Sequence, residues 1–390
     1  MTLSARIGRM EESLTLAMAQ KARELKAAGR ETLNLSAGEP NFDVPQVVKE
    51  EAIAAINSAF NKYTAVSGTD ELKAAIAGKL KRDNNLDYSP KNIVVSNGAK
   101  HSLFQLFAVL ADFGDEVIIP APAWVSYPEM ARYHGAKAVL TQTKSENGFK
   151  ITPKELEAAL SDKTKIVVIG SPSNPTGSVY SRDELAALGE VLKGTKALVI
   201  SDEIYEKLVY GVKFSACASI SRDLYERTIT VNGLSKSVAM TGWRLGYFAA
   251  ADEQIAKAVT KLQSQSTTNP CSIVQKAAIA ALDGRADKDI ETMRRRFEKR
   301  RDLALGLISK IDGLKPIAPD GAFYLFVSHE ALEKDSTAFC LKLLDEYGVV
   351  CTPGIGFSQE GYFRMSFAAN EEVIEKAIAQ IAKFADGYRR

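Results

Sequence analysis

Short apolar runs alternate with amphipathic stretches through the middle of the chain. The runs are rich in β-branched residues and cover 92–96, 115–120, 138–142, 165–170, 197–201, 228–232 and 245–250. Stretches with helical periodicity separate them, for example 99–112 and 181–194. Strands without polar alternation, joined by amphipathic helices, are typical of a mostly parallel sheet that is covered on both faces. The pattern therefore predicts a three-layer α/β fold around a seven-stranded sheet.

A different pattern begins near residue 283. A long charged helical stretch comes first, and two further helical stretches alternate with the apolar runs 321–327, 348–354 and 362–367. We expect a smaller α+β domain here, made of residues 1–40 and 283–390, beside a larger α/β domain of residues 41–282.

Composition removes several classes of function. The net charge of the 390-residue chain is only +2, and no basic cluster with interleaved aromatic residues occurs, so we expect no nucleic-acid partner. No apolar run reaches the roughly 18 residues of a membrane span, so we expect no membrane partner. Four widely spaced cysteines and three histidines argue against a metal site or a disulfide framework and favour a cytoplasmic location.

Residues with useful chemistry follow the predicted strands one after another. In parallel α/β sheets, ligands bind at the carboxyl ends of the strands. Gly98 and Ala99 open a helix after the first run, where exposed N–H groups can hold a phosphate. Neither a GxGxxG nor a GxxxxGK[ST] sequence is present, so a dinucleotide or nucleoside triphosphate is not indicated. Asn174 lies in a proline-rich turn after the run 165–170.

Two further strand ends carry the remaining groups. Asp202 and Tyr205 follow the run 197–201, and Lys236 with Arg244 follows the run 228–232. Each has an ordinary alternative role: Asp202 could be a helix cap and Lys236 a solvated loop lysine. Taken together, a phosphate cradle, an amide, a carboxylate with a phenol, and a lysine with an arginine suit a phosphorylated pyridine aldehyde. The lysine bonds reversibly to the aldehyde, and the carboxylate keeps the ring nitrogen protonated.

The chain resembles the class I/II aminotransferases of fold type I, and in particular the bacterial and plastid branch of aspartate and aspartate/prephenate aminotransferases. The motifs that carry the resemblance are AGEPNFD (37–43), NGAK (97–100), PAWVSYPEM (122–130), SPSNPTG (171–177), SDEIYE (201–206), SKSVAMTGWRLG (235–246) and FRMSFA (363–368). They span nearly the whole chain. The resemblance implies pyridoxal 5'-phosphate as the cofactor and no metal.

The resemblance also implies a role for each site residue. Lys236 would hold the cofactor and shuttle the proton, Asp202 would pair with the ring nitrogen, Asn174 and Tyr205 would bind the phenolic oxygen, and Trp124 would stack on the ring. The phosphate would be bound by Gly98, Ala99, Lys100, Ser235 and Arg244, together with Tyr63 of a second subunit. Arg364 would bind the substrate α-carboxylate, helped by Asn174 and the backbone near Gly38. One departure is visible, since Gly233 replaces a hydroxyl residue that many relatives have three positions before the lysine.

The implied reaction is ping-pong transfer of an amino group between L-aspartate or L-glutamate and an oxo acid, with prephenate as a second candidate substrate. Some relatives bind the distal carboxylate of the substrate with a partner arginine, but residues 263–283 contain none. In the branch that this chain resembles, a lysine, here Lys100, supplies the positive charge for the distal carboxylate, and a threonine, here Thr15, assists it. The alternative role of Lys100 is that of a solvated first-turn lysine. The resemblance further implies a homodimer. Other enzymes of the same fold stay open: a C–S lyase, a decarboxylase, a cyclopropane-forming synthase, or an aminotransferase of aromatic or neutral amino acids.

Overall fold

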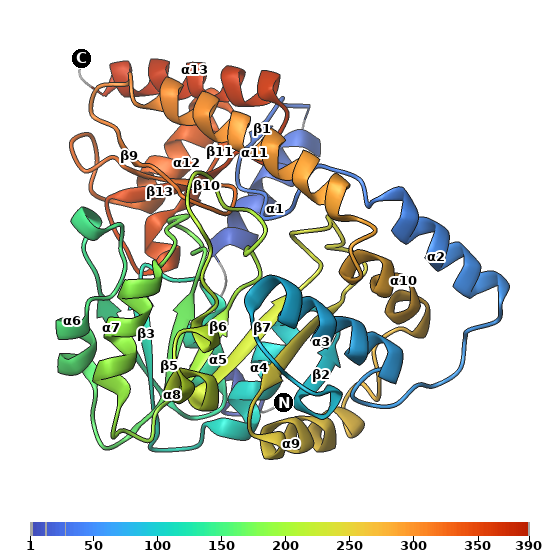
Figure 1. Cartoon of the computed structure of the whole chain (residues 1–390). Coiled ribbons are helices and arrows are strands. Elements are labelled where there is room, and N and C mark those ends of the chain that lie inside the picture. Colours follow the sequence, from blue (N-terminus) through green and yellow to red (C-terminus); the bar gives the residue numbers. More distant parts are fainter. Residues whose placement is uncertain (1–2, 12–13, 28, 389–390) are drawn as a thin grey trace.

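A seven-stranded sheet runs through the centre of the computed structural model, which describes residues 3–11, 14–27 and 29–388 (Figure 1). In spatial order its strands are β2 (Ile93–Ser96), β8 (Gly246–Ala250), β7 (Thr228–Gly233), β6 (Leu198–Asp202), β5 (Thr164–Gly170), β3 (Glu116–Ala121) and β4 (Lys137–Gln142). Strand β8 runs antiparallel to both of its neighbours, and the other adjacent pairs are parallel. The predicted mostly parallel seven-stranded sheet is confirmed.

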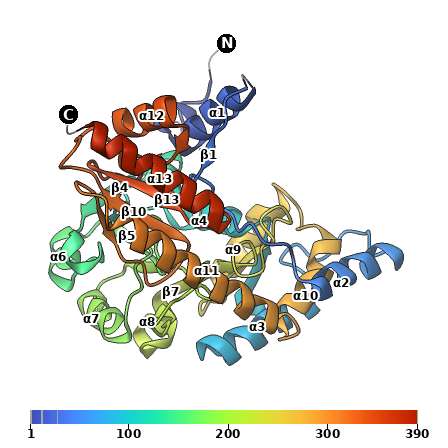
Figure 2. The same ribbon diagram turned by 90° about the horizontal axis from the view of Figure 1, so that it is seen from above.

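Helices cover both faces of this sheet. They are α2 (Gln46–Asn57), α3 (Asp70–Asn84), α4 (Ala99–Leu110), α5 (Ser126–Tyr133), α6 (Pro153–Ala159), α7 (Arg182–Leu192), α8 (Arg222–Arg227), α9 (Glu253–Ser264) and α10 (Ser272–Leu282). Adjacent strand residues point to opposite layers. Val168 therefore packs with α4, α5 and α9, whereas Val167 packs with α6, α7 and α8 on the other face. Helices α2, α3 and α10 extend that second face (Figure 2).

Side chains cap the starts of some helices and not of others, and this difference matters at the site. Thr152 and Ser181 cap α6 and α7 by accepting hydrogen bonds from the N–H groups of the third helical residues. Helix α4 instead begins after Gly98, whose φ is +85° and which supplies no side-chain cap. The first N–H groups of α4 consequently have no partner within the helix.

The C-terminal part forms a second, smaller unit above the ends of the central strands (Figure 1). Its antiparallel sheet has the order β12 (Thr352–Pro353), β13 (Tyr362–Ser366), β10 (Tyr324–Ser328) and β9 (Lys315–Ile317). Its helices are α1 (Leu14–Ala27), α11 (Asp287–Ile308), α12 (Ser336–Tyr347) and α13 (Glu371–Gly387). The chain also has short 3₁₀ helices, namely η1 (Ile7–Arg9), η2 (Pro90–Asn92), η3 (Ser145–Asn147), η4 (Cys217–Ser219) and, between β12 and β13 of the smaller unit, η5 (Gly354–Phe357).

The N-terminal segment joins this smaller unit. Strand β1 (Leu33–Asn34) pairs in parallel with β11 (Val349–Val350), and Met18 and Ala22 of α1 pack in the same core as α11, α12 and α13. The domain limits at 40/41 and 282/283 stay predictions. Within the described residues, no helix is long and apolar enough to cross a membrane.

Candidate active site

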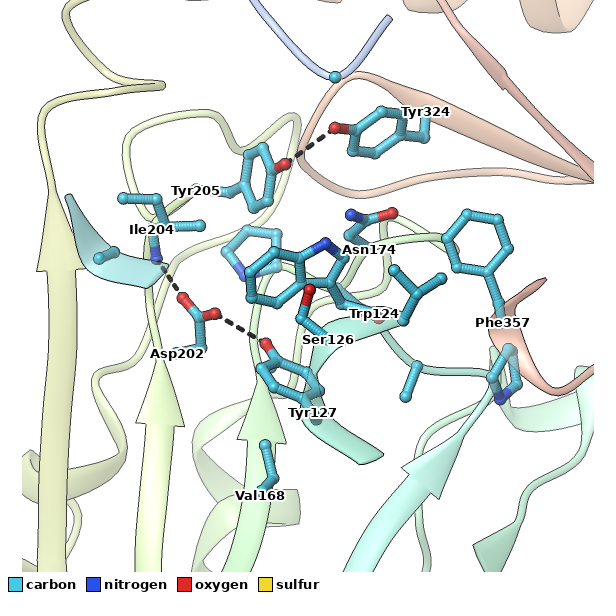
Figure 3. Close-up of a pocket in the computed structure, with 18 of the residues that line it drawn as sticks. Trp124, Ser126, Tyr127, Val168, Asn174, Asp202, Ile204, Tyr205, Tyr324 and Phe357 are labelled. Carbon is cyan, nitrogen blue, oxygen red and sulfur yellow. Dashed lines mark hydrogen bonds between the residues drawn. The ribbon is translucent and has the colours of Figure 1, made fainter. Parts of the chain in front are cut away.

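The carboxyl ends of the central strands and the smaller unit enclose a pocket of about 400 Å³. Eleven residues that the sequence predicts for the site line it: Gly38, Ala99, Lys100, Trp124, Asn174, Asp202, Tyr205, Ser235, Lys236, Arg244 and Arg364. Figure 3 shows the indole of Trp124 among the side chains of Asn174, Asp202 and Tyr205. Asp202 and Tyr127 lie at one end, and Tyr205 and Tyr324 lie at the other.

Lys236 lies three residues beyond the end of β7, and its Nζ donates a hydrogen bond to the backbone carbonyl of Gly38. Burial lowers the pKa of Lys236 to about 8; the negative charge of Glu39 opposes this shift, and the positive charge of Arg364 adds to it. An amine with this pKa is largely neutral at mildly alkaline pH. A neutral amine can act as a nucleophile and as a base, which a solvated lysine with an ordinary pKa does poorly.

Asp202 ends β6 and is 6% exposed. Its Oδ2 accepts a hydrogen bond of 2.7 Å from the hydroxyl of Tyr127, and its Oδ1 accepts one of 3.3 Å from the backbone N–H of Ile204 (Figure 3). A turn rather than an α-helix follows, so Asp202 does not cap an α-helix. Burial raises the pKa of Asp202, and the bond from Tyr127 opposes this. A cationic ligand atom placed beside this carboxyl group would restore its charged form.

Arg364 lies on β13, is 3% exposed, and makes its hydrogen bonds to neutral groups. Nη1 donates to Oδ1 of Asn174 at 2.9 Å, and Nη2 donates to the carbonyl of Ser36 at 2.9 Å and to Oγ1 of Thr352 at 3.4 Å. Its Nε is buried and has no partner among the described residues. A buried guanidinium that lines a pocket and makes no ion pair is suited to bind a carboxylate.

The start of α4 forms an anion cradle. The space where a Cβ of Gly98 would lie is only 2.5 Å from Nη2 of Arg244, so this guanidinium rests directly on the helix N-terminus. Nη1 of Arg244 donates to the carbonyl of Thr241 at 2.7 Å. Ser235 is buried in the wall of the same pocket. Free N–H groups, the positive end of the helix dipole, a hydroxyl and an arginine together suit a phosphate group.

Gly233, where many relatives have a hydroxyl residue, pairs with Gly246 across β7 and β8. A Cβ at Gly233 would lie 2.9 Å from the backbone oxygen of Leu245 and 3.0 Å from Cα of Gly246. A side chain here would displace β8. The structure therefore explains why this chain has glycine at the position.

Lys100, in the first turn of α4, extends over Trp124. Its Nζ lies 4.8 Å from the centre of the indole ring. Desolvation lowers the pKa of Lys100, and the nearby positive charge of Arg244 lowers it further. Trp124 also contacts Tyr127 edge to face at 5.3 Å. The tryptophan is thus held from two sides at the pocket wall.

Tyr205 does not point its hydroxyl at any charged group. Its hydroxyl and that of Tyr324 lie 2.9 Å apart and form a buried hydrogen bond (Figure 3). Burial raises the pKa of both phenols. Both rings are therefore neutral at physiological pH and can donate hydrogen bonds.

The charges around the pocket are unbalanced. Lys100, Lys236, Arg244 and Arg364 line it, and none of them makes an ion pair with a carboxylate in the described part of the chain. Asp202 is the buried carboxyl group among the lining residues. Such an excess of unpaired cations favours a ligand that carries several negative charges.

Two predicted residues are not part of this arrangement. Tyr63, between α2 and α3, is 88% exposed and does not line the pocket of its own chain. The side chain of Thr15 lies outside the described part of the structure, although its backbone belongs to α1.

The structure adds residues that the sequence analysis did not single out. Tyr127 and Tyr324 bond to predicted site residues, Thr352 bonds to Arg364, and the ring of Phe357 lies 5.0 Å from the Arg364 guanidinium carbon. Tyr127 falls within one of the motifs quoted above, so its position in PAWVSYPEM was an available signal. The other three lie on the smaller unit, and no local pattern relates them to the strand ends.

Comparison with protein families assigns the class. Residues 30–381 match the model of the family described as aminotransferase class I and II. The chain belongs to this family, which confirms the resemblance noted from its motifs.

Several proteins within this family are similar to the chain over its full length. The chain is 46% identical over 392 residues to an aspartate aminotransferase of Bacillus subtilis, and the match covers 99% of each chain. It is 44% identical over 397 residues to an aspartate/prephenate aminotransferase of Cereibacter sphaeroides, again with 99% of each covered. The solved structure of the Thermus thermophilus aspartate aminotransferase with maleate matches with a TM-score of 0.95 at 39% identity and covers 98% of this chain and 99% of that one.

Proposed function

We propose that the chain is a pyridoxal-phosphate-dependent aspartate aminotransferase, with prephenate as a second candidate amino acceptor. The observation that carries the proposal is the pocket in which four cations, none ion-paired to a carboxylate of the described residues, surround one buried carboxyl group. A phosphorylated cofactor and a dicarboxylic substrate together bring the negative charges that this arrangement lacks. The names of the full-length relatives support the same activity.

The residues present fit the cofactor. Arg244, Ser235 and the N-terminus of α4 would hold the phosphate. Arg244 can lie against this helix end because residue 98 is glycine, and a side chain there would fill the space that Arg244 occupies. Asp202 would pair with the ring nitrogen, and Trp124 would lie against the ring. When bound, the cofactor supplies an electron sink for the bond that is broken at the substrate Cα.

Lys236 would perform two tasks in this scheme. Its amine, with a pKa of about 8, would hold the cofactor covalently in the resting enzyme. Once freed by an incoming amino acid, the same amine would take the proton from the substrate Cα and deliver it to the cofactor carbon that is bonded to the substrate nitrogen. General acid–base catalysis of this kind accelerates a step by roughly 10²–10⁴-fold. Asn174 and Tyr205 would donate hydrogen bonds to the phenolic oxygen of the cofactor.

Arg364 would bind the α-carboxylate of every substrate, because it lines the pocket, its Nη atoms are fixed by neutral acceptors, and no carboxylate among the described residues pairs with it. Lys100 would bind the distal carboxylate, with help from Thr15. Aspartate, glutamate and prephenate all carry a second carboxylate, so the same pair of cations serves all three.

We further propose a homodimer in which Tyr63 reaches the phosphate site of the second subunit. Tyr63 is 88% exposed, and Ile53 and Ile56 on the neighbouring α2 are 55% and 59% exposed. Exposed apolar side chains gathered on one element favour burial against another protein surface. A second copy of the chain would cover them and would complete the site.

Half-reaction spectroscopy tests the proposed activity. Aspartate and glutamate should convert the bound cofactor to its aminated form and release one equivalent of oxo acid, and 2-oxoglutarate, oxaloacetate or prephenate should reverse the change. Aromatic and neutral amino acids should react much more slowly. Release of a thiol, pyruvate and ammonia from cysteine conjugates without the aminated cofactor would instead identify a C–S lyase.

A further inference from the structure

Tyr324 contacts both halves of the site with one side chain. It lies at the start of β10 and is 1% exposed. Its hydroxyl bonds to the hydroxyl of Tyr205 at 2.9 Å. The face of its ring lies 4.3 Å from the guanidinium carbon of Arg364. Tyr324 thus links a residue from the end of β6 to a residue of β13.

The hydroxyl contact constrains Tyr205. Only one proton lies between two bonded hydroxyls, so one tyrosine donates and the other accepts. Among the described residues, neither hydroxyl makes another hydrogen bond, and Gly38 packs closely enough that a Cβ on it would lie 3.2 Å from the Tyr324 oxygen. If Tyr205 donates its proton into the pocket, as the proposed function requires, Tyr324 must donate to Tyr205. A tyrosine that accepts such a bond is a stronger donor.

The ring contact constrains Arg364. The guanidinium carbon lies 4.3 Å from the Tyr324 ring and 5.0 Å from the Phe357 ring. Aromatic faces attract a cation without occupying its N–H groups. The two rings pack against the guanidinium and occupy none of its N–H groups.

We propose that Tyr324 is a positioning residue with two separable functions, in which its hydroxyl sets the donor direction of Tyr205 and its ring holds Arg364 for the substrate carboxylate. The proposal rests on the proposed function, because it assigns Tyr205 a cofactor oxygen and Arg364 a carboxylate. The charged groups that face the two phenols are Arg364 and Asp202. Neither is altered in the variants that test the hydroxyl.

Two substitutions separate the functions. Tyr324→Phe keeps the ring and removes the hydroxyl, whereas Tyr324→Leu removes both. Two readouts are needed on the cofactor-loaded protein: the pH at which the absorbance of the cofactor changes, and the Kd of maleate, a dicarboxylate that cannot react. Loss of a bond donated to an anionic oxygen destabilises the deprotonated chromophore and raises the pH of its transition.

We expect Tyr324→Phe to raise the absorbance transition by about 0.3–1 pH unit and to change the maleate Kd by less than about twofold. Tyr324→Leu should show the same pH shift and raise the maleate Kd by about 3- to 30-fold. If Tyr324→Leu does not fold, Phe357→Leu tests the ring function through the second aromatic ring beside Arg364; it should weaken maleate binding and leave the pH of the absorbance transition unchanged.

A double-mutant cycle with Tyr205→Phe tests the coupling. Tyr205→Phe should raise the transition further than Tyr324→Phe does, and adding Tyr324→Phe to it should cause no additional shift. Tyr210→Phe is a matched control, because Tyr210 is a fully buried tyrosine outside the pocket whose hydroxyl bonds to the carbonyl of Ala322. It should change neither readout.

Additive shifts in the double variant, or an unchanged transition in Tyr324→Phe, would overturn the hydroxyl function. An unchanged maleate Kd in both leucine variants would overturn the ring function. A wild-type protein that loads the cofactor without any pH-dependent absorbance would instead contradict the proposed function itself, so the two failures can be told apart.

Discussion

Lys100 is a cation in the first turn of α4, where the helix dipole disfavours positive charge. It makes no ion pair with a described carboxylate, and it extends over Trp124 into the pocket. This position is costly for a structural lysine, and it is suitable for a residue that meets an anionic substrate. The distal carboxylate of aspartate is the group that we assign to it.

Lys100→Leu should therefore lower kcat/KM for aspartate, glutamate and prephenate by about one to two decades, as expected for a charge-assisted hydrogen bond worth about 1.5–3 kcal/mol. Phenylalanine and aliphatic donors should be unaffected or improved. Thr15→Val should lower kcat/KM for the dicarboxylic substrates less, by the equivalent of about 0.5–1.5 kcal/mol. Steady-state kinetics with aspartate and phenylalanine decide the question, and equal losses for both would mean that Lys100 serves the cofactor.

The lowered pKa of Lys236 gives a second prediction. A lysine captures an aldehyde only as the neutral amine, and its pKa of about 8 lies well below the ordinary value of about 10.4. The rate at which cofactor-free protein captures pyridoxal phosphate should rise as the pH increases through about 8 and level off above it. Stopped-flow absorbance measures this rate. A rate that keeps rising to about pH 10 would show an unperturbed lysine.

Residue identities at the strand ends were predictable, but their partners were not. Lys236, Asp202 and Asn174 each follow an apolar run, so the sheet alone brings them to one edge. Tyr324 and Phe357 reach the same pocket from the antiparallel sheet and η5 of the smaller unit. Their approach depends on how the two units pack, and the hydrophobic pattern of a segment contains no information about that.

At the scale of elements, the start of α4 is the feature with the clearest consequence. A side chain at Gly98 would require an L-residue at φ +85° and would collide with Arg244. Gly98→Ala should cost about 1–3 kcal/mol of backbone strain and weaken cofactor binding by tenfold or more. Fluorescence titration with pyridoxal phosphate measures the affinity.

Gly78→Ala in α3 is the matched control. No atom lies within 4 Å of its added Cβ, and the residue lies inside a helix. It should leave cofactor affinity unchanged and stabilise the fold by about 0.5–1 kcal/mol. Wild-type affinity in Gly98→Ala would refute the cradle.

The elements themselves were largely evident from the pattern of apolar residues. Each predicted run of the central sheet became a strand, and most of these strands are buried on both faces; the edge strand β4 is only partly buried. The run 348–354 behaved differently: it divides into β11 and β12, which pair with different partners. Cys351 lies between them, where the chain passes from one sheet to the other. A local pattern cannot distinguish one strand from two, because both are equally apolar.

At the scale of the whole molecule, the proposed dimer places Tyr63 of one subunit in the site of the other. Mixed dimers test this. A subunit with Lys236→Ala cannot bond the cofactor covalently and has no turnover at its own site. A subunit with Tyr63→Phe weakens a phosphate contact only if Tyr63 acts somewhere in the dimer. In a hybrid of the two, the intact Lys236 would be paired with the intact Tyr63 across the interface.

The hybrid should therefore show wild-type cofactor affinity and turnover at one of its two sites. The Tyr63→Phe homodimer should bind the cofactor more weakly by about 0.5–1.5 kcal/mol at each site. Purification with two different affinity tags yields the hybrid. A hybrid no better than the Tyr63→Phe homodimer would show that Tyr63 acts within its own chain or not at all.

The central claim is that Lys236 is the lysine that carries the cofactor. It is tested most directly by reducing the pyridoxal-phosphate-loaded protein with borohydride and mapping the modified peptide by mass spectrometry. The account predicts a single stoichiometric phosphopyridoxyl group on Lys236, absent after treatment of Lys236→Ala. A stoichiometric label on Lys100, or on any lysine outside the pocket, would contradict it.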